Sequence, residues 1–179
     1  MKPDLDHWLP DPALRVAHRR ESSAGPERLW AAARAVTLTD TSLLGRLVRL
    51  RVPGTKPSVS FDELFRSPPF IVLHEEPEAL VSGIVGRIWT IRRDYPRLAG
   101  PEEFLSWSKD GTAKVVFANW VEPVDRAGAA LASETRVQSI GMQGRLGLSA
   151  VRPLIRAFHP LVGSEAIEAA VRIAERLAR

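Results

Sequence analysis

The sequence contains no cysteine. Disulfide bonds, cysteine nucleophiles and thiolate metal sites are therefore excluded, and the composition allows a cytoplasmic location, which is the one we expect. No apolar run approaches the ~20 residues needed to cross a bilayer, so we expect no transmembrane segment. The first twelve residues are polar and broken by prolines, and they lack the apolar stretch of a secretory signal.

A strong charge of one sign is also missing. The net charge is only +4, from 25 basic and 21 acidic residues, although the sequence pI is near 10.1. This pI reflects a modest excess of arginine, and it does not predict a nucleic-acid partner.

Common catalytic motifs are absent as well. The four histidines are scattered, without an HExxH motif or a close i, i+4 pair, so we expect no metal and no other cofactor. There is no GxSxG, P-loop or GxGxxG motif, so serine hydrolysis and nucleotide binding have no support. The cluster at residues 74–76 (His-Glu-Glu) is either a polarised base or a solvated strand end. No motif specifies a reaction.

What is present is enough chain for one globular domain. The 179 residues contain no repeat and no shift in composition, which indicates a single domain at residues 13–179 behind an extended N-terminal arm at residues 1–12. We expect Trp8 to pin the arm to the body. A domain of this length buries about 70% of its unfolded surface, so its core needs no metal or disulfide.

The order of the predicted elements indicates an α+β fold. Residues 13–20 alternate as a strand, and two short helices follow it, one starting at Pro26 and one after the N-cap residues 40–42. Further strands are predicted at residues 70–76, 79–90, 112–122 and 129–140. This order predicts a curved antiparallel sheet wrapped around a long C-terminal helix.

The C-terminal segment is amphipathic from Gly144 to Arg179. Pro160 and Gly163 interrupt it, which predicts either a kinked helix or two consecutive helices, the second capped by Ser164.

This element order, from Ala13 onward, resembles the START/polyketide-cyclase (SRPBCC) superfamily with its helix-grip fold. Two segments resemble the local sequence of actinobacterial members that have no assigned activity. They are GIVGRIW at residues 83–89 and ASETRV at residues 132–137. The chain departs from the superfamily in having fewer clear strands, and residues 104–109 are a candidate for another. The resemblance implies a cavity between the sheet and the C-terminal helix that binds a small apolar or aromatic molecule. It implies no catalytic residue, because the superfamily shares no catalytic set.

Strand alternation predicts which side chains face that cavity. Lys114 and Glu122 belong in water, which turns Phe117 and Asn119 inward. With Arg87 outward, Ile84 and Ile88 point inward and Trp89 points outward, unless a bulge at Gly86 reverses this. The complete predicted lining is Ile84, Ile88, Phe117, Asn119, Thr135 and Val137 from the sheet, with Leu154, Phe158 and His159 from the helix.

Five polar residues leave alternatives open. An inward Asn119 amide must find hydrogen bonds, because leaving it unpaired costs about 1–3 kcal/mol, and a ligand, the backbone or water could supply them. Glu134 and Arg136 share one face, and Arg87 could reach Glu134 if their strands were neighbours. These three residues are either a polar anchor inside the pocket or an outer ion pair worth under ~1 kcal/mol. His159 is either a ligand contact or part of the packing at a helix end.

Three functions follow as hypotheses. The first is a binding module for a small apolar or aromatic molecule. The second is a cyclase or dehydratase acting on a polyketide-like or lipid-like substrate, with Asn119, His159 or the Glu134–Arg136 pair as candidate groups. The third is an interaction module with a filled core, which uses either the irregular residues 91–110 or the outward-facing tryptophans. The sequence leaves the oligomeric state open.

Overall fold

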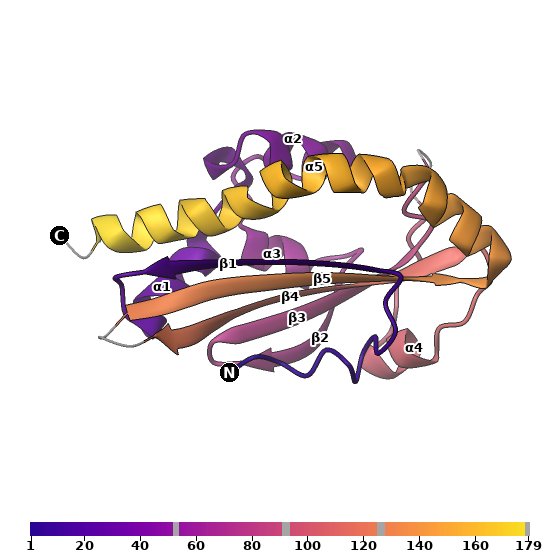
Figure 1. The fold of residues 1–179 in the computed structure, drawn as a ribbon, viewed down its shortest axis with the longest axis horizontal. Helices are drawn as coiled ribbons and strands as arrows, with labels where there is room; N and C mark the ends of the chain where they lie inside the picture. The colour runs from indigo at the N-terminus through magenta and orange to yellow at the C-terminus, as the bar shows by residue number, and fades with distance from the viewer. Residues whose placement is uncertain (52–53, 91–93, 125–127, 178–179) are drawn as a thin grey trace.

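Five antiparallel strands form one curved sheet, which the long helix α5 crosses (Figure 1). The computed structural model describes residues 1–51, 54–90, 94–124 and 128–177, without the side chains of residues 51 and 154–163. The strand order across the sheet is β1-β5-β4-β3-β2. The strands are β1 (Leu14–Ser22), β2 (Ile71–Glu76), β3 (Ala79–Gly86), β4 (Thr112–Val124) and β5 (Gly128–Ile140).

Short helices occupy the connections between β1 and β2 and between β3 and β4. They are α1 (Pro26–Ala35), the 3₁₀ turn η1 (Leu38–Asp40), α2 (Leu43–Arg51), α3 (Phe61–Arg66) and α4 (Pro101–Ser106). Pro26 starts α1, where its missing N–H costs no hydrogen bond. A capping box starts α3, because Ser60 Oγ accepts from the Glu63 N–H and the Glu63 carboxylate accepts from the Ser60 N–H.

The C-terminal segment is one helix, α5 (Gly141–Arg176), of 36 residues. The alternative of two consecutive helices was therefore wrong. A proline inside a helix costs about 3 kcal/mol through a lost hydrogen bond and a steric clash, and packing on both sides of Pro160 offsets this cost. Leu148 before it and Ile167 and Ala170 after it are buried in the core.

Both faces of the sheet are covered (Figure 1). One face carries α1, α2, α3 and α5. The other carries the N-terminal arm and α4, which pack on the sheet through a separate hydrophobic cluster. Leu5 and Leu9 anchor the arm and are almost completely buried, whereas Trp8 is only half-buried. The arm is thus part of the core.

This second cluster corrects the expectation that Lys114 lies in water. The Lys114 side chain is buried, its Nζ donates to the carbonyl of Leu105 at 2.9 Å, and it lies 4.9 Å from the centroid of the Phe104 ring. Burial lowers the pKa of Lys114. Helix α4 brings Phe104 and Leu105 to this face. It includes residues 104–106 of the candidate strand at residues 104–109, and residues 107–109 form no strand, so that expectation was wrong.

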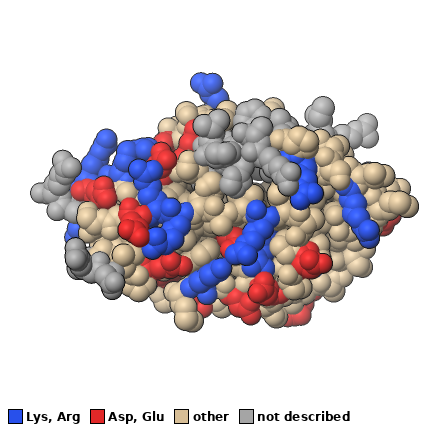
Figure 2. All heavy atoms as spheres, in the orientation of Figure 1, with Lys and Arg blue, Asp and Glu red and all other residues tan. Residues whose placement is uncertain are grey.

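This architecture confirms the α+β helix-grip class predicted from the sequence. The two short helices expected after the first strand are α1 and α2, and α3 follows them before the β2–β3 hairpin. On the face drawn in Figure 2, acidic and basic side chains are interspersed. Within the described residues, no helix has the length and apolar character that a bilayer crossing requires.

Candidate functional site

A pocket of about 500 Å³ lies between the sheet and the helices above it. Two hydrophobic clusters on this face adjoin it. One joins α1, α3 and α5 to the end of the sheet near the β4–β5 connection, and the other lies under the first turns of α5. The pocket therefore lies between two hydrophobic clusters, and residues of both clusters contribute to its walls.

The floor of the pocket is formed by alternate residues of four adjacent strands. Because successive side chains of a strand point to opposite faces, every second residue reaches the pocket. The floor residues are Leu14, Val16 and His18 on β1, Leu131, Ser133, Thr135 and Val137 on β5, Val115, Phe117 and Asn119 on β4, and Leu80 and Ile84 on β3.

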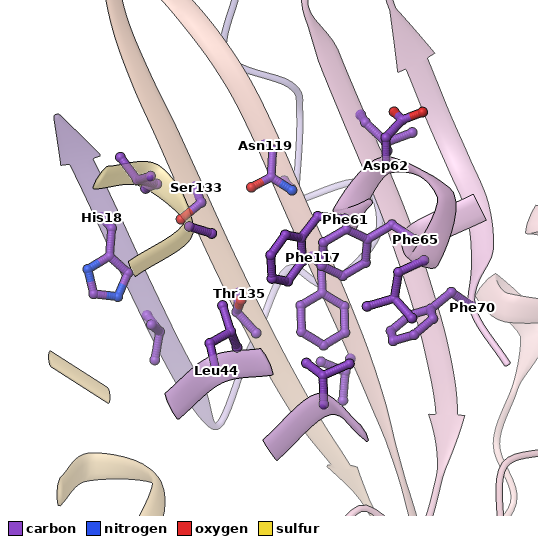
Figure 3. Close-up of a pocket in the computed structure, with 18 of the residues that line it drawn as sticks. His18, Leu44, Phe61, Asp62, Phe65, Phe70, Phe117, Asn119, Ser133 and Thr135 are labelled. Carbon is purple, nitrogen blue, oxygen red and sulfur yellow. The ribbon is translucent and has the colours of Figure 1, made fainter. Parts of the chain in front are cut away.

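Four phenylalanines form a continuous aromatic wall on one side of the pocket (Figure 3). The ring of Phe65 lies 5.3 Å from those of Phe70 and Phe117, measured between centroids, and 6.3 Å from that of Phe61. Phe70 and Phe117 meet edge to face at 5.7 Å. These separations are typical of stacked and T-shaped aromatic pairs, so the wall presents both ring faces and ring edges.

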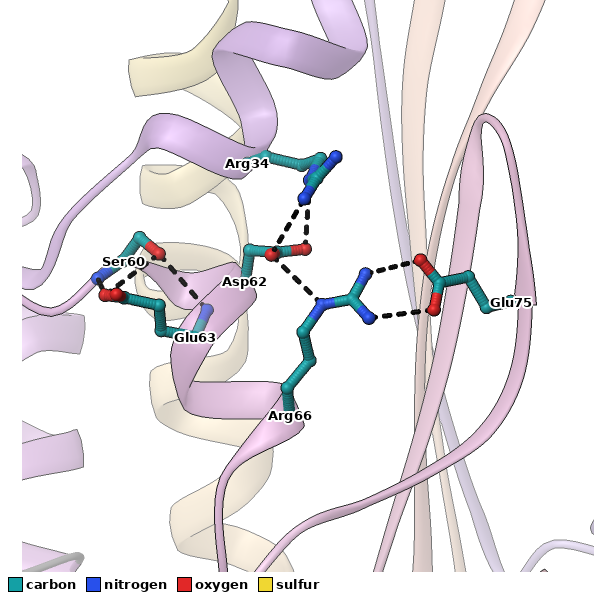
Figure 4. A network of polar contacts seen from close by, with 6 residues as sticks. All are labelled: Arg34, Ser60, Asp62, Glu63, Arg66 and Glu75. Carbon is teal, nitrogen blue, oxygen red and sulfur yellow. Dashed lines mark hydrogen bonds and ion pairs between the residues drawn. The ribbon is translucent and has the colours of Figure 1, made fainter.

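A chain of ion pairs fixes α3, the helix that presents Phe61 and Phe65 (Figure 4). Asp62 binds Arg34 of α1 at 3.3 Å and Arg66 at 3.0 Å. Arg66 also binds both carboxylate oxygens of Glu75 on β2, at 2.8 and 2.7 Å. The bond from Arg66 lowers the pKa of Glu75. These ion pairs connect α1, α3 and the edge of the sheet, and so help to position the aromatic wall.

Helix α2 forms part of the roof through Leu44, Leu47 and Val48. Its first turn is capped by a carboxylate from α5. Glu165 Oε2 accepts from the N–H groups of Leu43 and Leu44 at 3.1 and 3.0 Å, and Ser42 Oγ donates to Oε1 at 2.8 Å. A negative charge at a helix N-terminus satisfies unpaired N–H groups and is stabilised by the helix dipole.

Polar side chains in the pocket are few. Asn119, Ser133 and Thr135 lie on the floor and are half-buried. In the part of the chain that the structure describes, no hydrogen bond joins any of these three side chains to another residue. Arg34 and Asp62 also line the pocket, but they are paired with each other. His18 and Tyr95 complete the polar lining.

The structure brings six of the predicted lining residues to the pocket, namely Ile84, Ile88, Phe117, Asn119, Thr135 and Val137. Their role in binding stays a prediction. The other three, Leu154, Phe158 and His159, have side chains outside the described residues.

Ile88 reaches the pocket although β3 ends at Gly86. Gly86 has a φ of 143°, so the strand alternation does not continue through it. The alternation predicted an outward Trp89, with a reversal at Gly86 as the alternative, and the structure has the reversal. Ile88 and Trp89 both pack against the cluster on the pocket side of the sheet, and the Trp89 indole lies against Gly147 of α5.

The predicted polar anchor is not in the pocket. Glu134 and Arg136 lie on the opposite face of β5, buried beneath the N-terminal arm. Arg87 cannot reach Glu134, because β4 separates β3 from β5. Arg87 instead lies 3.7 Å from Asp94. Of the two alternatives, the outer face is the observed one, but the pair is buried rather than exposed.

Sequence reasoning missed most of the wall and roof. The i, i+4 spacing of Phe61 and Phe65 was an available signal, since it puts both rings on one side of a helix. Ser133 shares the alternation of Thr135, and His18 shares that of Leu14 and Val16. No local signal indicated that α3 lies against the sheet beside Phe117.

Within the described residues, no group of three His, Cys, Asp or Glu side chains could hold a metal ion.

The chain is similar in structure to a hypothetical protein of Helicobacter pylori, with 9% identity, a TM-score of 0.48, and coverage of 97% of this chain and 95% of that one. It is also similar to a norcoclaurine synthase point mutant from Thalictrum flavum, in complex with a transition-state analogue (14%, TM-score 0.46, coverage 93% and 96%). A third is an aromatase/cyclase from a Streptomyces species (11%, TM-score 0.36, coverage 93% and 96%). No protein-family model and no curated protein matches the sequence.

Proposed function

We propose that this chain binds a small apolar or aromatic molecule in the pocket between the sheet and helices α1, α2, α3 and α5. The observation that carries the proposal is a space of about 500 Å³ surrounded mainly by apolar and aromatic side chains. Protein interiors normally contain few voids larger than a water molecule, whereas ligand pockets occupy about 300–1,000 Å³. The size and lining therefore favour a binding site over imperfect packing.

The aromatic wall supports an aromatic ligand in particular. Phe65 and Phe117 offer ring faces and edges to a flat molecule, and Ile84 and Val137 contribute aliphatic surface to the floor. We also propose that the chain is related to the START/polyketide-cyclase superfamily and to its actinobacterial members. The order of its elements resembles theirs, and that resemblance implies the same kind of ligand. Leu154, Phe158 and His159 remain proposed contacts from α5.

A cyclase or dehydratase would need an acid or base directed into the pocket. Glu134 and Arg136 lie on the opposite face of the sheet, so they do not serve this purpose. Among the described lining residues, the ionisable groups are His18, Tyr95 and the paired Arg34 and Asp62. Binding requires only the space and its apolar and aromatic lining, both of which are present, so it is the function that this arrangement supports best.

Fluorescence titration with N-phenyl-1-naphthylamine, a neutral probe that brightens in apolar surroundings, tests the proposal. We expect the wild-type protein to bind it and Ala166→Phe, which adds a ring to the lining on α5, to bind about tenfold more weakly. The matched control is Ala150→Phe, an exposed position on the same helix, which should bind like the wild type. No binding by the wild type, or equal binding by Ala166→Phe, would overturn the proposal.

A further inference from the structure

We infer that the ligand of this pocket is a neutral molecule with an apolar or aromatic body and one hydroxyl or carbonyl group, and that Asn119 and Ser133 bind this group. The inference rests on the proposed binding function and specifies the chemistry of the ligand. Its basis is the register of the sheet, which gathers the polar side chains of the floor into one place.

The register places three polar residues in one row across three strands. Ser133 of β5 is the direct partner of His18 on β1 and of Asn119 on β4. Directly opposed residues of antiparallel strands have Cβ atoms about 4.5–5.5 Å apart. All three residues line the pocket, and Figure 3 shows them on adjacent strands to one side of the phenylalanine wall. We call this set the polar row.

The rows on either side of the polar row are mainly apolar. On one side, Leu131 pairs with Val121, and both are buried. The third member of that row is Arg20, an exposed residue that pairs with Glu168 and does not line the pocket. On the other, Thr135 pairs with Phe117 and with Val16. The floor is thus mainly apolar. Asn119 and Ser133 are directly paired in the polar row, and the Thr135 hydroxyl lies in the row next to them.

Two side chains of the polar row, Asn119 and Ser133, can form hydrogen bonds with a ligand. Neither the Asn119 amide nor the Ser133 hydroxyl bonds another residue in the described part of the chain. Both groups can donate and accept, so together they suit either a hydroxyl or a carbonyl oxygen. A ligand hydroxyl can donate to Asn119 Oδ1 while it accepts from Ser133 Oγ. A hydrocarbon in the same place would displace water from both groups and return no hydrogen bond, which is unfavourable.

The charges around the pocket favour a neutral ligand. Among the described lining residues, the permanently charged pair is Arg34 and Asp62, which neutralise each other at 3.3 Å. Asp62 is further bound by Arg66 at 3.0 Å. A carboxylate or ammonium group in the pocket would lose its water without gaining an opposite charge, and that loss is costly. A neutral oxygen group needs only the hydrogen bonds that the polar row provides.

The experiment compares 4-butylphenol with butylbenzene, two ligands of similar shape that differ by one hydroxyl. Each displaces N-phenyl-1-naphthylamine from the protein near neutral pH, where the phenol is uncharged. We expect the wild type to bind 4-butylphenol about threefold to tenfold more tightly, the range that a neutral hydrogen bond provides. Asn119→Leu, which keeps the shape of the side chain, should abolish this preference without weakening butylbenzene binding.

Two further variants keep the inference testable. Ser133→Ala should reduce the same preference for 4-butylphenol. This variant replaces Asn119→Leu as the test if Asn119→Leu does not fold. Ser149→Ala removes a hydroxyl from an exposed position of α5 that does not line the pocket, and it should leave the preference unchanged. Equal affinities for the two ligands, or equal effects of Ser149→Ala and Asn119→Leu, would overturn the inference while leaving the binding proposal intact. If the wild type does not bind the reference probe at all, the binding proposal itself fails.

Discussion

Arg136 donates from Nε to Oε1 of Glu134, two residues earlier on β5, at 2.6 Å, and the two side chains are only 5% and 1% exposed. The second carboxylate oxygen of Glu134 accepts from Arg15 at 2.8 Å and lies 3.5 Å from Lys2 Nζ. Burial raises the pKa of Glu134, but the hydrogen bonds from Arg15 and Arg136 outweigh this effect, and the pKa is lowered. The carboxylate therefore stays ionised beneath the N-terminal arm.

The same arginine holds the arm. Its Nη1 donates to the carbonyl of Leu9 at 2.8 Å and to the carboxylate of Asp6. The arm thus depends on both apolar burial and this polar contact. Glu134 and Arg136 are structural residues, which explains why two charged side chains occur on one strand of a buried sheet.

Replacing Glu134 with alanine should destabilise the protein by at most about 3–5 kcal/mol, because Arg136 would lose its buried carboxylate partner and keep only the exposed Asp6 carboxylate and the Leu9 carbonyl. The free energy of unfolding, measured by urea denaturation, tests this. Glu21→Ala is the control, since Glu21 is mostly exposed and pairs with Arg19 on the surface. It should change the free energy of unfolding by less than about 1 kcal/mol. A similar loss in the two variants would contradict the role of the buried pair.

Glu165 should contribute stability that depends on pH. Burial raises its pKa, but the hydrogen bonds from Leu44, Ser42 and Leu43 stabilise the carboxylate more strongly, so its pKa lies below the ordinary value of 4.5. A lowered pKa means that the contribution is present above the unfolded-state pKa and is lost as pH falls through the folded-state pKa. Glu165→Gln should therefore cost about 1–2 kcal/mol near neutral pH.

The difference in unfolding free energy between the wild type and Glu165→Gln should then shrink as the pH is lowered below 4.5. Denaturation curves of both proteins, recorded at a series of pH values, measure it. Other carboxylates with lowered pKa values, such as Glu75, affect both proteins alike and cancel in the difference. A difference that persists unchanged at acidic pH would show that Glu165 acts through packing rather than through its charge.

Gly86→Ala should be strongly destabilising. Gly86 has a φ of 143°, which side-chain-bearing residues rarely adopt, and an added Cβ would meet the Asp94 carbonyl oxygen in a severe clash. We expect a loss of at least about 2 kcal/mol from strain alone. Gly100→Ala is the matched control, because its backbone is extended and an added Cβ meets open space. A thermal melt of both variants decides the question, and equal melting temperatures would refute the argument.

Much of the fold was predictable because its signals are local. The alternation along β4 and β5 separates Phe117 and Thr135 from Val116 and Arg136 without any knowledge of other elements. The rule that sends charged residues to water failed at Lys114 for the opposite reason. What covers Lys114 is α4, and no pattern near residue 114 reveals it.

The pocket was less predictable than the sheet. Phe61 and Phe65 become wall residues because core packing and the ion pairs of Asp62, Arg66 and Glu75 hold α3 against its neighbours. The polar row depends on pairing that joins residues 18, 119 and 133, which are distant in sequence.

The sequence by itself determined the element order, the alternation of each strand and the amphipathic character of the last helix. These properties follow from backbone periodicity, which acts between residues close in the chain. The tertiary structure decided that α5 continues through Pro160, that the arm covers the far face, and that His18, Ser133 and Asn119 share one row. Those outcomes depend on packing and register between distant segments, because burial and strand pairing are settled only when the whole chain has folded.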